Sequence, residues 1–285
     1  MLTNIHPVNH SAVFKLVESL KLKGYSDNTI KTYQNEFGQF LVALKNNSVE
    51  ECSSEKIRSY MLYCYEHLRL TENTLHSRIN ALKFYFEQVL HRDKMFFKEI
   101  PRPKKHLQLP KTIHASDIKK MFDVTTNLKH NTMLKLCYGM GLRLSEIINI
   151  KITDIDSQNM QVFIARSKGK KDRYVNLPQS ILEQLRDYYK EFRPQKYLFE
   201  GQNGGQYAKR SLQNVFKNAL RKAGINKEVG IHSLRHSYAT HLLEQGTDIR
   251  FIQELLGHRD IKTTLIYTNV SNDSIRNIKS PLDSL

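Results

Sequence analysis

The chain has 285 residues, 40% of them hydrophobic, and its 44 Lys and Arg exceed its 28 Asp and Glu to give a formal net charge of +16. This composition predicts a globular protein, and its basic charge favours nucleic acid as the partner, although a surface that is basic only for solubility is the alternative. Three cysteines without a CxxC pair, no signal peptide and no apolar window of membrane-spanning length argue against a disulfide-rich secreted or a membrane protein, so a cytoplasmic location is expected.

The first part of the chain, from residue 11 to residue 90, has a helical pattern throughout. Ser26 is expected to cap a helix in which Ile30, Phe37 and Leu44 fall on one face. Similar apolar faces follow at 57–68 and 75–89. We therefore predict a small bundle of three to four helices, without strands, as a first domain over residues 1–98.

A proline-containing basic segment follows the bundle. The stretch "EIPRPKKHLQLPKTI", residues 99–113, contains three prolines that prevent a continuous helix and four Lys or Arg residues between Arg102 and Lys111. It is predicted to link the first domain to a second one over residues 114–285. The charge fits a solvated tether and equally a basic strap that closes a clamp around a duplex.

The second domain has a mixed pattern. Helices are predicted at 115–122 and 129–138, and the segments "MQVFIA" and "RYVNL" around "RSKGKKD" predict a β-hairpin. Further helices are predicted at 179–192, 209–223, 233–245 and 248–256. The expected fold is therefore mainly α with a small antiparallel β-sheet, in two domains.

One helical stretch, "IHSLRHSYATHLL", combines apolar residues with an unusual set of basic ones. His232, Arg235 and His236 lie at i, i+3 and i+4, and so on neighbouring parts of one helix face. Zinc is disfavoured because the HExxH order is absent and Arg235 would place a fixed cation beside the metal. His236 and His241 are expected to be core or capping residues, whereas His232 and Arg235 are open to either a structural or a functional role.

Other segments carry candidate functional residues. Arg143 lies in "GMGLRLSEIINI" at a turn flanked by glycine, just before a predicted helix. Lys168 lies at the predicted hairpin tip, where a mobile cation can reach a bound backbone. His258 follows a helix end in "LLGHRD", and Tyr267 follows in "TTLIYTNV".

Three further cations of the hairpin, Lys170, Lys171 and Arg173, are predicted to be backbone-phosphate contacts or solvated turn charges rather than catalytic groups. The sequence does not separate these two interpretations.

This set of motifs resembles, in order and in sequence context, the active site of the tyrosine recombinases, which include the phage integrases and the Xer-type site-specific recombinases. The matching residues are Arg143, Lys168, His232, Arg235, His258 and Tyr267, and Glu146 matches the acidic residue usual after the first Arg. The resemblance spans roughly residues 112–270, and the helical first part is similar to the family's core-binding, SAM-like domain. It implies a two-domain clamp on DNA.

The resemblance also implies a role for each residue. Arg143 and Arg235 would hold the charge that builds on the scissile phosphate, and Tyr267 would attack it to form a 3′-phosphotyrosyl link. His232 is the candidate to assist deprotonation of Tyr267, whose phenol has an ordinary pKa of about 10. His258 would hydrogen-bond the phosphate, and Lys168 would protonate the leaving 5′ oxygen. Neither a cofactor nor a metal is needed.

The implied partner is double-stranded DNA with inverted-repeat sites, bound by a homotetramer on two paired sites or together with a second recombinase. The implied location is the nucleoid in a bacterial cytoplasm. The residues after Tyr267 are expected either to dock on a neighbouring subunit or to form a disordered end. A type IB topoisomerase and a non-catalytic architectural DNA-binding protein are the alternatives; the complete residue set favours the recombinase.

Overall fold

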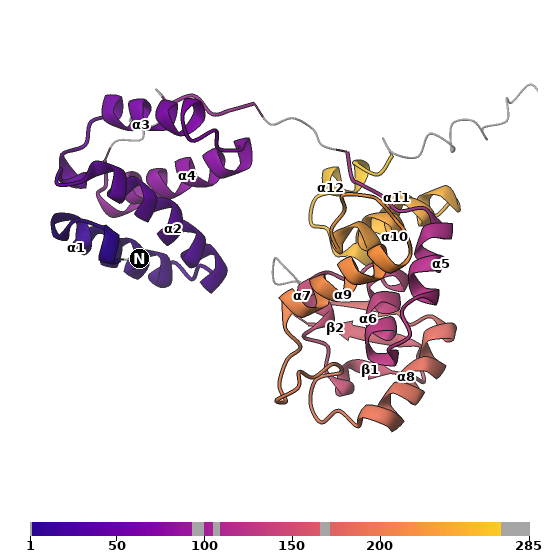
Figure 1. Ribbon diagram of the computed structural model, residues 1–285. Coiled ribbons are helices and arrows are strands. Elements are labelled where there is room, and N and C mark those ends of the chain that lie inside the picture. Colours follow the sequence, from indigo (N-terminus) through magenta and orange to yellow (C-terminus); the bar gives the residue numbers. More distant parts are fainter. Residues whose placement is uncertain (1, 93–99, 105–108, 166–171, 269–285) are drawn as a thin grey trace, which may run out of the picture. The chain divides into compact units, whose positions relative to one another are not determined.

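The computed structural model describes residues 2–92, 100–104, 109–165 and 172–268, and the chain divides into two compact units, Met1–Leu107 and Gln108–Leu285 (Figure 1). The boundary falls inside the predicted linker 99–113. Both ends of that linker pack on the nearest unit, because Ile100 is buried in the core of the first unit and Ile113 in the core of the second. No helix in the described part of the chain is long and apolar enough to cross a membrane.

The described residues of the first unit contain helices and no strand, as predicted. Ser26 caps α2 by accepting a hydrogen bond from the backbone of Thr29, which confirms the predicted start of that helix. The pattern over 75–89 forms one α-helix that continues as a π-helical segment. The elements are short 3₁₀ turns at Leu2–Asn4, Pro7–Asn9 and Val49–Glu51, with α1 His10–Leu22, α2 Asp27–Leu44, α3 Ser54–Glu66, α4 Glu72–Phe84 and the π-helical Tyr85–Val89.

The second unit is built mainly from helices, with a 3₁₀ turn at Ile152–Asp154. The predicted helices all form, within about two residues of their predicted ends, because apolar periodicity is a local signal, and Asn127 and Asp248 also cap two of them. The helices are α5 Ala115–Asp123, α6 Leu128–Gly139, α7 Leu144–Ile147, α8 Gln179–Phe192, α9 Lys209–Lys222, α10 His232–Glu244, α11 Ile249–Leu256 and α12 Lys262–Leu265.

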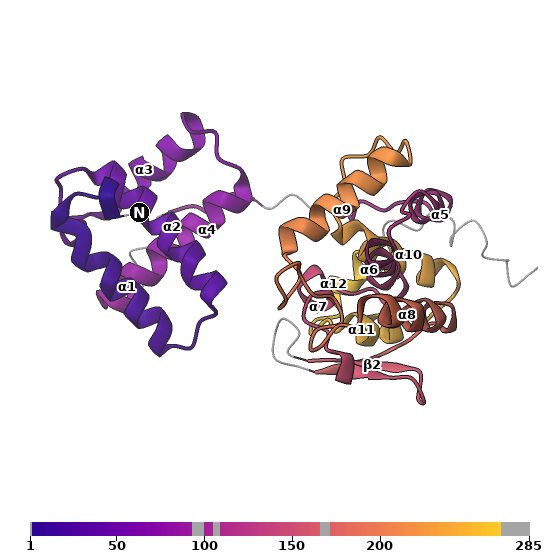
Figure 2. The ribbon, with the colours of Figure 1, turned by 60° about the horizontal axis from the view of Figure 1, so that its bottom comes forward.

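The sheet of the second unit has three antiparallel strands in the order β1-β2-β3. The predicted hairpin is formed by β2 Gln161–Ile164 and β3 Arg173–Asn176, in a register that pairs Val162 with Val175. Strand β1, Ile155–Asp156, was not predicted because two residues carry no periodicity. Figure 2 shows the sheet along one edge of the unit, where β3 packs beside α11.

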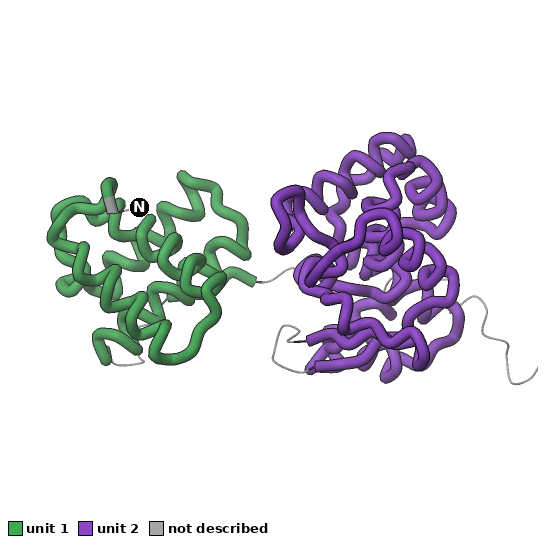
Figure 3. The backbone as a smooth tube through the Cα atoms, turned by 90° about the horizontal axis from the view of Figure 1, so that it is seen from below, with its two compact units in different colours: residues 1–107 green, residues 108–285 purple. Residues whose placement is uncertain are grey.

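Each of the two units shown in Figure 3 has its own hydrophobic core. In the second unit, α10 lies between the main core, which contains Leu234, and a smaller cluster, which contains Ala239 and Tyr267. His241 hydrogen-bonds the Tyr138 hydroxyl through its Nδ1 at 2.9 Å, so it is a packing residue as expected. The helix that carries the candidate motif is therefore buried on two sides, which fixes the position of its polar residues.

Candidate active site

Arg143 is presented by a sharp turn between α6 and α7. Gly141 has a φ of +58°, and a Cβ at that position would lie 2.5 Å from a ring carbon of Tyr238, so this turn requires glycine. Arg143 directly precedes α7, and its Nη1 donates to Glu146 Oε1 at 2.7 Å while its backbone N–H donates to Glu146 Oε2 at 2.9 Å. The turn and Glu146 together fix the direction of the guanidinium.

Arg235 is the second guanidinium of the site and is only 3% exposed. From α10 it donates to the backbone oxygens of Gly141 at 2.7 Å and Leu256 at 2.6 Å. Burial, reinforced by the positive charge of Arg143, lowers the pKa of Arg235 to about 9, so the group is cationic at neutral pH. Arg235 thus links the turn before Arg143 to the end of α11 and places its charge close to that of Arg143.

His258 follows α11 at a left-handed turn made by Gly257, whose φ is +63°. Its Nε2 lies 3.0 Å from Arg235 Nη2, and its Nδ1 lies 2.9 Å from the Thr264 hydroxyl. Because a guanidinium can only donate, Nε2 accepts and the proton of the neutral imidazole is on Nδ1. Burial and the neighbouring arginines lower the pKa of His258 to about 4, which agrees with a neutral ring.

Tyr267 lies just after α12 and its side chain is buried, with 1% exposed. It packs in the small cluster with Ala239, Ile252 and Leu256, and its ring stacks near that of His258, with centroids 6.4 Å apart. Burial raises the pKa of the phenol, although the charges of Arg235 and Arg143 oppose this rise. In the structure described here, the candidate nucleophile is therefore protonated and shielded from solvent.

The hydrogen-bond partner of Tyr267 is His236, not His232. The phenol oxygen lies 3.0 Å from His236 Nδ1, whereas His232 is exposed one helical turn earlier. His236 was expected to be a core or capping residue, and sequence reasoning missed this contact. The sequence signal for this contact was an apolar helix face: His236, Ala239 and Leu243 lie at i, i+3 and i+7. This face packs on the Tyr267 cluster. Burial lowers the pKa of His236 to about 4, so it is a weak base for a phenol.

Of the four basic hairpin residues considered in the sequence, the structure describes one. Lys168, Lys170 and Lys171 lie outside the described residues. Arg173 is described, and its interpretation as a solvated turn charge was wrong, because its side chain is 8% exposed and pairs with Glu146. Its interpretation as a backbone-phosphate contact stays a prediction. The sequence pattern of a basic turn could not show that a buried carboxylate lies opposite this residue.

Glu146 accepts hydrogen bonds from two arginines and lies within ion-pair distance of a third. It receives hydrogen bonds from Arg143 and Arg173, and its Oε2 lies 3.9 Å from Arg235 Nη1. Burial alone would raise the pKa of Glu146, but the hydrogen bonds and charge of Arg173, and then of Arg143, lower it to about 2. A carboxylate that is ionised at neutral pH thus lies among guanidiniums that would otherwise repel one another.

Glu146→Gln is expected to destabilise the protein at neutral pH, by an amount that shrinks in acid. A folded-state pKa of about 2, against an ordinary 4.5, corresponds to about 3 kcal/mol of stability. This contribution is complete above the ordinary pKa and is lost as the pH falls toward 2. Urea unfolding of both proteins from about pH 7 to about pH 3 measures it, with Glu183→Gln on the exposed face of α8 as the control. A difference as large at pH 3 as at pH 7 would contradict the assignment.

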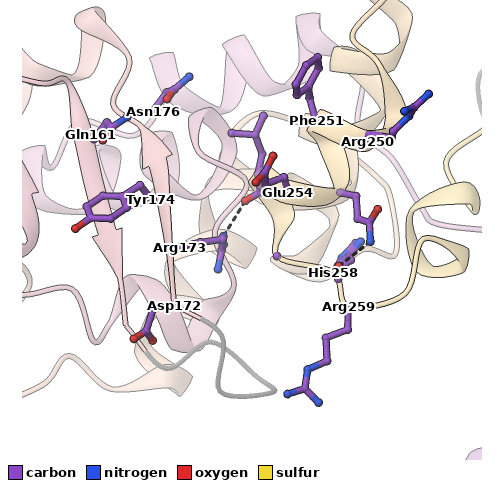
Figure 4. A pocket seen from close by; sticks show the side chains of 13 residues that line it. Gln161, Asp172, Arg173, Tyr174, Asn176, Arg250, Phe251, Glu254, His258 and Arg259 are labelled. Atoms are coloured by element: carbon purple, nitrogen blue, oxygen red, sulfur yellow. Dashed lines mark hydrogen bonds between the residues drawn. The ribbon is translucent and has the colours of Figure 1, made fainter.

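A groove of about 910 Å³ lies beside the site, between β3 and α11 (Figure 4). Arg173 reaches across it from β3, His258 lies at its end, and the exposed side chains of Arg250, Phe251 and Arg259 line it. Among the described residues, no three His, Cys, Asp or Glu side chains gather in a way that could hold a metal ion. The site therefore offers cations, imidazoles and one phenol, a set suited to a phosphodiester.

Comparison with known proteins agrees with this chemistry. Residues 111–273 match the phage integrase family, and residues 14–94 match the phage integrase N-terminal SAM-like domain. A putative integrase/recombinase of Sinorhizobium fredii (y4qK) is 36% identical over 272 residues, covering 95% of this chain and 88% of that protein. Tyrosine recombinase XerC of Bacillus subtilis is 32% identical over 283 residues, covering 92% of each.

Solved structures show the same likeness. The crystal structure of XerA recombinase is 27% identical, with a TM-score of 0.55 and coverage of 94% of this chain and 96% of that one. A lambda integrase tetramer bound to a Holliday junction is 16% identical, with a TM-score of 0.75 and coverage of 95% and 79%, and so shares the fold. The chain belongs to the phage integrase family, as a tyrosine recombinase of the Xer-like type. Its activity is site-specific DNA recombination by strand cleavage and rejoining.

Proposed function

We propose that this recombinase cleaves DNA through Tyr267, with Arg143, Arg235 and His258 around the scissile phosphate. The observation that carries the proposal is the convergence of these four residues from separate elements: Arg235 Nη2 lies 3.0 Å from His258 Nε2, the His258 and Tyr267 rings are stacked, and Arg143 donates to Gly257 at 3.4 Å. Two guanidiniums hold the charge of a pentavalent phosphate, and a phenol supplies the attacking oxygen.

The proposed step conserves the energy of the phosphodiester. The Tyr267 oxygen forms a bond to phosphorus, the bond from phosphorus to the 5′ oxygen breaks, and the phenol proton is lost while the 5′ oxygen gains one. Lys168 is proposed as the donor of that second proton, and His232 as a group that assists loss of the first. A 5′ hydroxyl from another strand reverses the step and completes the exchange.

The remaining assignments of the proposal concern assembly. Residues 1–98 and 114–285 are proposed as a DNA-binding domain and a catalytic domain that close on one duplex, with 99–113 as the basic strap between them. The net charge of +16 supports contact with DNA backbones. A tetramer on two paired inverted-repeat sites is proposed because the exchange joins two duplexes, and a lambda integrase tetramer on a Holliday junction shares the fold. Action on the nucleoid in the cytoplasm follows from this substrate.

Covalent capture tests the proposal. The wild-type protein is incubated with fragmented DNA of the source genome, and the mixture is then denatured. DNA that stays linked to protein is recovered and sequenced. The variant Tyr267→Phe is the negative control. Adducts at one or a few inverted-repeat sites are expected. Adducts spread without sequence preference would instead indicate a relaxing enzyme of the topoisomerase kind, and the absence of adducts would indicate a protein that only binds DNA.

A further inference from the structure

Arg173 lies at the start of β3, and each nitrogen of its guanidinium donates a hydrogen bond inside the protein. Its Nη1 and Nη2 donate to the two oxygens of Glu146 at 3.0 Å and 2.9 Å, and its Nε donates to the Leu255 backbone oxygen at 2.8 Å. The side chain is 8% exposed. Figure 4 shows it reaching from the strand toward α11. Three of the five N–H donors of this guanidinium are therefore engaged inside the protein.

The pair with Glu146 fixes the plane of that carboxylate. A carboxylate can rotate about its last torsion, and a bidentate guanidinium removes this freedom because both oxygens are held in one plane. The same two oxygens accept the hydrogen bonds that orient Arg143, from its Nη1 and from its backbone N–H. The direction of Arg143 therefore depends on Arg173 through the acceptor that the two arginines share.

Arg173 also contacts the turn that carries His258. A Cβ on Gly257 would lie 3.0 Å from Arg173 Cδ and 3.2 Å from its Nη1, so the arginine packs directly on this glycine. The Gly257 backbone oxygen accepts a hydrogen bond from Arg143 Nη2 at 3.4 Å. One side chain thus connects β3, the end of α11 and the Arg143 turn.

We propose that Arg173 is a positioning residue of the recombinase, which acts through Glu146 to hold the Arg143 guanidinium in place at the scissile phosphate. The inference rests on the proposed function, because it needs Arg143 to neutralise charge on that phosphate. If the inference is correct, substitution of Arg173 slows cleavage of a charged phosphate more than cleavage of an uncharged one. If Arg173 only supported the fold, its substitution would slow the reaction equally on both substrates.

The test compares two forms of one nicked duplex, built on a sequence recovered by covalent capture. One form has an ordinary scissile phosphodiester, and in the other a methyl group replaces one non-bridging oxygen and removes its charge. Arg173→Lys keeps the charge and loses the bidentate pair. We expect single-turnover adduct formation by this variant to be about 10- to 100-fold slower than wild type on the phosphodiester. On the methylphosphonate the two proteins should react at similar rates.

Arg186→Lys, at an exposed position of α8, is the matched control and should equal wild type on both substrates. Equal slowing of Arg173→Lys on both substrates, or no slowing on either, would overturn the inference. Arg173→Gln is the second variant, and failure of both variants to fold at low temperature would make Arg173 a structural residue and equally overturn it. If the wild type forms no Tyr267 adduct on the phosphodiester, the proposed function itself is wrong.

A double variant gives a second test of whether Arg173 acts through Glu146. If Arg173 acts through Glu146, the variant Glu146→Gln and the double variant with Arg173→Lys should have the same rate on the phosphodiester, because the second change removes nothing further. Multiplicative slowing in the double variant would show that Arg173 acts independently of Glu146 and would overturn the inference.

Discussion

Tyr267→Phe is expected to abolish covalent DNA–protein adducts while it leaves the fold intact. The change removes only the oxygen that is proposed to attack phosphorus, and loss of a nucleophile costs roughly 10⁴-fold or more in rate. The ring stays buried in its cluster with Ala239, Ile252 and Leu256. Because the phenol oxygen also makes the hydrogen bond to His236, removing it should lower stability by about 1 kcal/mol.

Adducts are counted on denaturing gels with the captured DNA site, and the free energy of unfolding is measured in urea. Tyr189→Phe, at an exposed position of α8, is the control and should form adducts as the wild type does. Binding of uncleaved DNA should be the same for all three proteins. Adducts formed by Tyr267→Phe would place the nucleophile on another residue.

The burial of Tyr267 means that its side chain must change position before the proposed attack on the phosphate. A phenol that is 1% exposed and hydrogen-bonded to His236 cannot contact a phosphate in that position. The proposed attack by Tyr267 therefore requires its side chain to leave this position and its hydrogen bond to His236 to break. The low pKa of His236, about 4, means that this histidine holds the neutral phenol rather than deprotonating it.

Arg235→Lys is expected to slow cleavage by about 10²- to 10³-fold, the usual cost of losing one fixed donor to a developing oxyanion. A lysine keeps the charge but donates from one nitrogen only. It therefore cannot hydrogen-bond Gly141, Leu256 and His258 together. Two buried carbonyls then lose their donor. Stability should fall by about 3 kcal/mol, because such unpaired groups are costly in the interior.

The two effects of Arg235→Lys are separated by measuring the single-turnover rate well below the melting temperature of the variant and the unfolding free energy in urea. Arg186→Lys again serves as the exposed control. A variant with normal cleavage and reduced stability would show that Arg235 is only a structural residue, contrary to the proposed function.

Local signals were sufficient for much of this protein. Ser26 and the apolar repeat after it predicted α2, the helix at 179–192 was predicted with the bounds of α8, and the glycine-containing turn between two β-rich segments predicted the β2–β3 hairpin. Caps, turns and helical periodicity act over a few residues, so they can be recognised in a sequence. The ordered set of Arg143, Lys168, His232, Arg235, His258 and Tyr267 resembled that of the tyrosine recombinases, and this resemblance indicated the chemistry.

Tertiary packing decided which of these residues meet. Arg173 lies 27 residues from Glu146 and His236 lies 31 residues from Tyr267, and in each case the contact depends on how separate elements pack. In the sequence, Arg173 looks like another charge of a basic turn, and His236 like a core histidine. The sequence by itself determined the elements and the candidate chemistry, whereas the carboxylate that orients Arg143 and the imidazole that holds Tyr267 were decided by the tertiary structure, because burial and pairing are properties of the packed whole.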